Sequence, residues 1–149
     1  MKNYLFILLI VAATNGFCQV KVENNVQYKT VKLKADDGVF LSLKRLAQKR
    51  MPEFVDSLKK NGADYKNFRF IVKSDFVEQG SHEHMWSRVF VYNKEVFKAI
   101  FIDSPFTIKN IKTGDKILIR KSDIEDWVIY KNEVKVAGDF SEKYLNSKQ

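Results

Sequence analysis

Residues 84–102 read HMWSRVFVYNKEVFKAIFI. Aromatic and β-branched residues fill both ends of this stretch, and Asn93 and Lys94 lie between them. Two such runs joined by a short polar pair are typical of a β-hairpin. We therefore expect antiparallel strands over residues 84–92 and 96–102.

The same pattern continues on both sides of this hairpin. Upstream, FRFIVK (68–73) alternates with a period of two, which predicts a strand with one buried face. Downstream, the turn residues of 113–115 lead into a strand over 116–120, and residues 127–130 and 134–137 resemble a second hairpin. The total is five or six antiparallel strands.

A helical period precedes the strands. Pro52 lies inside this segment and lacks the backbone N–H, so we expect the helix to be kinked or broken there. Lys44, Gln48 and Lys49 belong to the opposite side of the helix, which we expect to face water. The apolar residues that recur at steps of three and four are Phe40, Leu43, Leu46, Ala47, Met51, Phe54, Val55 and Leu58. An amphipathic helix packed on an antiparallel sheet makes the fold class α+β.

Composition favours a single globular domain. The chain has 149 residues, of which 45% are hydrophobic, and a formal net charge of +8. The 26 basic residues are scattered among 18 acidic ones instead of forming a stripe. A scattered excess indicates solubility and weak attraction to anions.

The first 18 residues have the pattern of a secretory signal peptide. Lys2 supplies a positive start, residues 4–13 are apolar, and a small-x-small triplet ends at Cys18. The apolar run is too short for a transmembrane helix. An uncleaved anchor and a lipidated Cys18 are the alternatives, but the bulky Phe17 before the cysteine argues against lipidation. We expect cleavage after Cys18 and a periplasmic or secreted product.

Export has consequences for chemistry. Cys18 is the single cysteine, so the mature chain has no disulfide and no thiol chemistry. A location outside the cytoplasm argues against nucleic acid, ATP and NAD as partners, and we expect a monomer with no cofactor and no membrane span. The expected division is a signal peptide (1–18), an N-terminal arm (19–36), an α+β domain (37–140) and a polar tail (141–149).

Both histidines and both tryptophans fall in two short segments, residues 80–86 and 122–127. The motifs are Phe70-x-Val72-Lys73, Gly80-x-x-Glu83-His84-Met85-Trp86, Pro105, Gly114-Asp115 and Ile124-x-Asp126-Trp127. In this order they resemble the YegJ-like family of small bacterial proteins, known as domain of unknown function 2314. The resemblance covers about residues 39–140. It implies the fold and the site but no activity.

The candidate site follows from the densest polar and aromatic residues, which are Glu83, His84, Trp86, Asp126 and Trp127. We expect them to meet at one end of the sheet, with His84 hydrogen-bonded to Asp126 or Glu83. Such a surface would bind a protein or a cell-envelope ligand.

An enzyme is the alternative. His82 and His84 share one face of a strand, a spacing that suits zinc or copper, with Asp123 or Asp126 as a third ligand. A hydrolase would instead use His84 as general base, oriented by Glu83 or Asp126. The candidate nucleophiles are Ser81, Ser87 and Ser122. No nucleophile elbow or metalloprotease motif supports either chemistry.

Purely structural roles are a further alternative. Tryptophans are usually buried with the indole N–H paired, and Asp126 would then cap backbone amides near Trp127. Glu125 and Asp126 are adjacent, so their side chains should diverge and not act as a catalytic pair.

Overall fold

The computed structural model describes residues 20–23, 26–29, 34 and 36–148. The chain divides into two compact units, and the boundary between them falls after Lys32. In the first unit, β1 (Val20–Glu23) pairs antiparallel with β2 (Val26–Lys29). The expected signal peptide, residues 1–18, lies outside the described residues.

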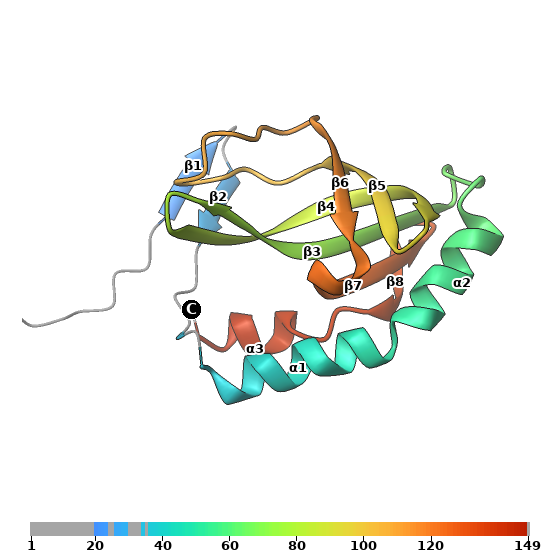
Figure 1. Cartoon of the computed structure of the whole chain (residues 1–149), viewed down its shortest axis with the longest axis horizontal. Helices are drawn as coiled ribbons and strands as arrows, with labels where there is room; N and C mark the ends of the chain where they lie inside the picture. Colours follow the sequence, from blue (N-terminus) through green and yellow to red (C-terminus); the bar gives the residue numbers. More distant parts are fainter. Residues whose placement is uncertain (1–19, 24–25, 30–33, 35, 149) are drawn as a thin grey trace, which may run out of the picture. The chain divides into compact units, whose positions relative to one another are not determined.

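The second unit contains an antiparallel sheet of six strands in the order β6-β5-β4-β3-β7-β8 (Figure 1). The strands are β3 (Phe68–Glu78), β4 (Ser81–Asn93), β5 (Val96–Phe101), β6 (Lys116–Arg120), β7 (Ile124–Lys131) and β8 (Val134–Gly138). Each strand predicted from the alternation is present. The α+β class with an antiparallel sheet is confirmed.

Two of the hairpin turns share one backbone geometry. Lys94 and Glu95 have φ of 46° and 63°, and Asn132 and Glu133 have φ of 49° and 65°. Two consecutive residues with positive φ are typical of type I′ turns, whose twist matches that of the flanking strands. Both hairpins predicted from the sequence are confirmed by these turns and by the pairing of β4 with β5 and β7 with β8.

The segment before the sheet forms two helices, α1 (Gly38–Lys49) and α2 (Met51–Asn61). Arg50 separates them, and Pro52 lies in the first turn of α2. A proline is tolerated there because the N–H groups of a first turn have no partner within the helix. Of the two possibilities considered for Pro52, the break is the correct one.

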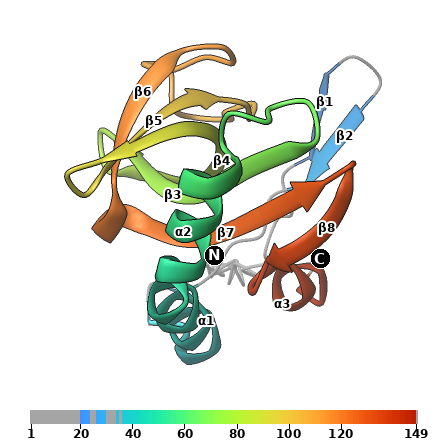
Figure 2. The ribbon, with the colours of Figure 1, turned by 90° about the vertical axis from the view of Figure 1, so that its right-hand side faces the viewer.

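Helix α2 lies against the concave side of the curled sheet (Figure 2). Phe54 lies at the centre of the core, and its ring centre is 5.4–5.8 Å from the ring centres of Phe70, Phe97 and Trp127. The predicted apolar stripe is wrong at Leu46, whose exposed fraction is 41%. Neighbouring residues diverge by about 100° around a helix, and Ala47 takes the buried position.

The end of the chain forms the short helix α3 (Glu142–Asn146). The hydroxyl of Tyr144 donates a hydrogen bond to Asp37 Oδ2 at 2.7 Å. The other oxygen of Asp37 accepts the N–H of Phe40 and so caps α1. In the part of the chain that the structure describes, no helix has the length and apolar character needed to cross a bilayer.

Candidate functional site

Pairing between β3 and β4 gathers polar and aromatic side chains on one face of the sheet. Lys73 lies opposite Trp86, and Asp75 lies opposite His84. Residues directly opposite in an antiparallel pair share a face, and His82 joins them because it is two positions from His84. We call this surface the histidine face and define it as Lys73, Asp75, His82, His84 and Trp86.

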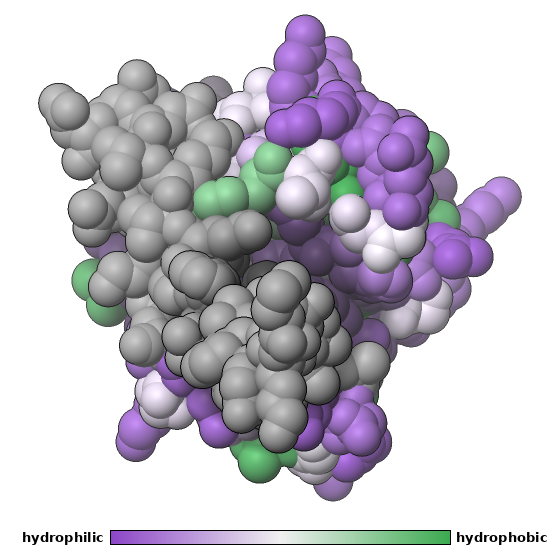
Figure 3. All heavy atoms as spheres, turned by 90° about the vertical axis from the view of Figure 1, so that its left-hand side faces the viewer, coloured by the Kyte–Doolittle hydropathy of each residue, from purple (hydrophilic) through white to green (hydrophobic). Residues whose placement is uncertain are grey.

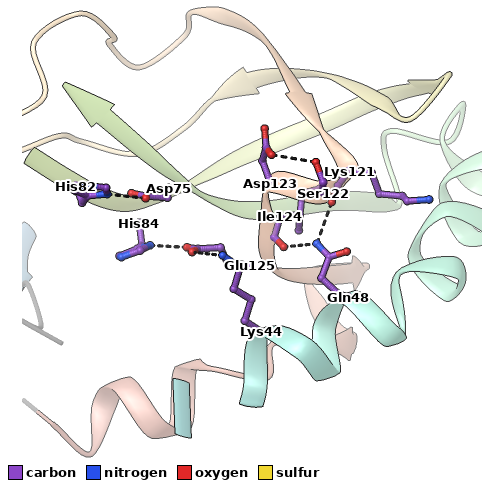
Figure 4. A network of polar contacts seen from close by, with 10 residues as sticks. All are labelled: Lys44, Gln48, Asp75, His82, His84, Lys121, Ser122, Asp123, Ile124 and Glu125. Carbon is purple, nitrogen blue, oxygen red and sulfur yellow. Dashed lines mark hydrogen bonds and ion pairs between the residues drawn. The ribbon is translucent and has the colours of Figure 1, made fainter. Parts of the chain in front are cut away.

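His84 is held by a carboxylate from a distant part of the chain. Its Nδ1 lies 2.5 Å from Glu125 Oε2, and Lys44 Nζ lies 3.0 Å from the other oxygen of Glu125 (Figure 4). The exposed fraction of the Glu125 side chain is 4%, against 40% for His84. The partner of His84 is therefore Glu125, and the prediction of Asp126 or Glu83 was wrong.

A β-bulge explains this partner. In the pairing of β3 with β7, Lys73 lies opposite Asp126 and Ser74 lies opposite Ile124, which leaves Glu125 as the extra residue. A bulge redirects the side chain of the residue that it inserts. Glu125 therefore reaches His84, whereas Asp126 keeps its place in the ladder.

Helix α1 supports the bulge with two polar side chains. Lys44 pairs with Glu125, and Gln48 donates to the carbonyl oxygens of Ile124 and Lys121 (Figure 4). Both side chains were expected to face water. They turn toward β7 because Glu125 is a buried carboxylate that needs a cation and the nearby backbone carbonyl groups accept a donor.

Glu125 is ionised in this setting. Burial is the largest single effect and would raise the pKa of Glu125. The hydrogen bonds and charges of His84 and Lys44 together outweigh burial and hold the pKa below its ordinary value. Removing either partner would leave a buried carboxylate with less compensation.

The rest of the histidine face repeats this chemistry nearer to solvent. His82 Nδ1 lies 2.7 Å from Asp75 Oδ2, and the His82 side chain is 57% exposed.

The remaining cation of the histidine face, Lys73, is nearly buried, and its Nζ lies 4.7 Å from the ring centre of Trp86. Burial lowers the pKa of Lys73 below its ordinary value, although the charge of Asp126 opposes the shift.

Asp126 and Trp127 do not belong to this surface. Their exposed fractions are 1% and 0%. Asp126 accepts the backbone N–H groups of Trp127, Phe140 and Ser141, and the indole N–H of Trp127 donates to the carbonyl of Ala47 at 2.9 Å. The capping role considered for Asp126 and the core role considered for Trp127 are confirmed. Neither side chain is accessible from the surface in this structure.

Glu83 points away from the two histidines and fixes a loop. Its carboxylate accepts the backbone N–H groups of Phe106 and Ile108 at 2.8 and 3.0 Å, and both the N–H and the hydroxyl of Thr107. Burial raises the pKa of Glu83, but these donors outweigh burial and hold the pKa below its ordinary value. The expected cluster of five residues is thus divided, and His84 and Trp86 remain on the histidine face.

On the side of the molecule shown in Figure 3, hydrophilic residues lie deeper than the other described residues beside them. The family model described as "Uncharacterized protein conserved in bacteria (DUF2314)" matches residues 39–148. The chain belongs to the DUF2314 family. It is 27% identical over 142 residues to uncharacterized protein YegJ of Escherichia coli (strain K12), a match that covers 95% of this chain and 86% of that protein. No solved structure matches.

The DUF2314 segment contains each residue of the histidine face and its supports, so the site belongs to the family domain. Neither the description of YegJ nor that of the family names an activity. Sequence reasoning missed Lys44, Lys73, Asp75 and Glu125 as members or supports of the site. The sequence carried a signal for two of them, because Lys73 ends the first motif of the resemblance and Glu125 is the acid beside Asp126.

Two of the serines considered as nucleophiles have no hydrogen bond to His84. The Ser87 hydroxyl is fully buried and has no hydrogen-bond partner in the described structure, and Ser122 donates to Asp123. Among the described residues no hydroxyl hydrogen-bonds to His84. No group of three histidine, cysteine or carboxylate side chains in that part of the chain is arranged to hold a metal ion.

Proposed function

We propose that this member of the DUF2314 family is an exported protein of the cell envelope that binds a partner molecule through the histidine face. Export is supported by the signal-peptide pattern of residues 1–18. Mass spectrometry of the protein recovered from its host tests this part, with a chain that begins at Gln19 as the expected result. Soluble cytoplasmic protein that retains Met1 would contradict it.

The orientation of the His84 ring is the observation that supports binding. Glu125 is hydrogen-bonded to Nδ1 of the ring, and Lys44 forms an ion pair with Glu125. The rings of His84 and Phe40 are in edge contact, with 5.6 Å between their centres. No described residue hydrogen-bonds to Nε2, and the ring is 40% exposed. A fixed ring with one free nitrogen can bind a ligand without first losing rotamer freedom.

The groups on the histidine face favour an anionic ligand. Glu125 and one oxygen of Asp75 are engaged with the histidines, and the other oxygen of Asp75 is buried. The groups that remain accessible are the outer edges of the two imidazoles and the half-buried Trp86, and the nearly buried Lys73 ammonium adds positive charge beneath Trp86. Imidazolium and ammonium groups donate hydrogen bonds to carboxylate or phosphate, and an indole adds apolar contact area. The net charge of +8 raises the encounter rate with anions. The ligand class is therefore a carboxylate or phosphate group carried by a protein or an envelope polymer.

The two tryptophans make the test specific. Inorganic phosphate and acetate are titrated into the exported protein while the two indole N–H signals and the His84 ring signals are followed by NMR. The His84 ring and Trp86 should shift, and Trp127, which is buried and bonded to Ala47, should not. Glu125→Gln should weaken the response because it releases the ring. The absence of any shift, or equal shifts of both indoles, would contradict the proposal.

One observation favours a second candidate function, acid–base catalysis. A histidine whose Nδ1 faces a buried carboxylate has the geometry of a general base. The carboxylate is Glu125 instead of Asp126, which is fully bonded to backbone. Hydrolysis of p-nitrophenyl acetate that is abolished by His84→Gln, with unchanged Trp127 signals, would replace the binding proposal with this one.

A further inference from the structure

A second surface, on β4, β5 and β6, combines apolar and basic side chains. Its side chains line a groove of about 380 Å³. We call it the lysine groove and define it as Phe90, Val91, Lys98, Ile100, Lys116 and Leu118. It is separate from the histidine face.

The register of the sheet explains why these side chains point outward. Lys98 lies opposite Leu118, and Ile100 lies opposite Lys116, so all four share one face. Their neighbours Phe97 and Ala99 point into the core. The lysine groove is therefore on the side of β5 and β6 that faces away from the core packed against α2.

Large apolar side chains in the groove are exposed to solvent. Leu118 is 71% exposed on the edge strand β6, and Val91 and Phe90 are 46% and 38% exposed. The register of β4 against β5 shifts between Val89 and Val91, and this irregularity leaves both Phe90 and Val91 outside the core. Contiguous exposed apolar side chains are typical of surfaces that bind a protein, a membrane or a ligand.

The charge of the groove has one sign. Lys98 and Lys116 form no ion pair with any described residue, whereas Lys44, Lys121 and Lys135 are each paired with a carboxylate. Arg88 adds a further cation, with its guanidinium 5.3 Å from the Phe90 ring centre. Unpaired cations beside exposed apolar groups are complementary to a surface that is anionic outside and apolar beneath.

We propose that the lysine groove docks this protein on the surface of an anionic lipid bilayer. Leu118, Val91 and Phe90 enter the boundary between headgroups and acyl chains, while Lys98 and Lys116 contact lipid phosphates. A pocket for a free amphiphile would enclose most of the ligand. The side chains of this groove project from the sheet and do not enclose a ligand, so they fit the surface of a bilayer better than the acyl chain of a single bound amphiphile.

The test is co-sedimentation of the exported protein with vesicles of phosphatidylglycerol and phosphatidylethanolamine, compared with vesicles of phosphatidylcholine. Every variant is prepared in the same way, so the N-terminus is identical in all samples. Lys98→Glu with Lys116→Glu should weaken binding to the anionic vesicles on the order of tenfold or more. The matched control, Lys49→Glu with Lys60→Glu, changes the same charge at exposed positions of α1 and α2 and should stay within about twofold.

A second pair of variants tests the apolar contribution. Leu118→Ser should weaken binding, and Val134→Ser, at a residue 63% exposed on the opposite edge strand β8, should not. Thermal melts followed by circular dichroism verify that each variant is folded. Equal losses in both charge variants, no loss with Leu118→Ser, or capture of free laurate without vesicle binding would overturn the proposal.

Discussion

His84 Nδ1 lies 2.5 Å from Glu125 Oε2, although 41 residues separate the two in the chain. The contact joins β4 to the bulge of β7 across the intervening strand β3. One side of the imidazole is thereby fixed while the other faces outward. The carboxylate of the bulge thus also orients the ring, and the binding proposal rests on this orientation.

Glu125→Gln should destabilise the fold in a manner that depends on pH. The folded state holds the pKa of Glu125 below its ordinary value, so ionised Glu125 contributes stability above the unfolded pKa of about 4.3. This contribution is lost as pH falls through the lower folded pKa. In urea unfolding we expect a loss of about 1–3 kcal/mol at pH 7 and a smaller one at pH 3. A difference that stays constant between these pH values would show that the charge of Glu125 does not matter.

Lys44→Met should cost more than the same change at Lys49. Lys44 neutralises the buried Glu125, and its loss leaves that carboxylate with one cation fewer. We expect a decrease in the free energy of unfolding of about 1–2 kcal/mol for Lys44→Met and less than about 0.5 kcal/mol for Lys49→Met. Identical urea midpoints for the two variants would mean that Lys44 is a solvated residue, as its place in the helix pattern first suggested.

The two helices offer a comparison of buried and exposed apolar residues. Phe54→Ala removes the ring that contacts Phe70, Phe97 and Trp127, and should cost about 3–5 kcal/mol. Leu46→Ala, at a residue 41% exposed, should cost less than about 1 kcal/mol. Chemical denaturation of both variants measures the difference. Comparable losses would mean that the core is not centred on Phe54.

The sequence predicts the strands well and the site poorly, for physical reasons. Strand period and turn residues are local signals, and they locate the hairpins around Lys94 and Asn132. Helix period likewise locates α1 and α2 and the break near Pro52. It does not resolve Leu46 from Ala47, because an apolar stripe is wider than the buried contact.

The partner of His84 depends on features without a local signal. The bulge that inserts Glu125 exists only in the pairing of β3 with β7, strands that are not neighbours in the chain. Lys44 is 81 residues from Glu125 and was assigned to solvent by its helix position. Asp126 was the better candidate from composition, yet ladder geometry directs it to the backbone of Ser141.

Glu125 is placed to fix the proton of His84 on Nδ1, and the binding proposal requires that Nε2 is left free. Long-range ¹H–¹⁵N NMR correlation of the histidine rings, recorded at pH 9, reports the tautomer of each ring. In the wild type, the neutral His84 ring should carry its proton on Nδ1, which faces Glu125, and Glu125→Gln should abolish this preference. An Nε2-protonated ring at high pH, or fast averaging between the two tautomers as in free imidazole, would contradict the account.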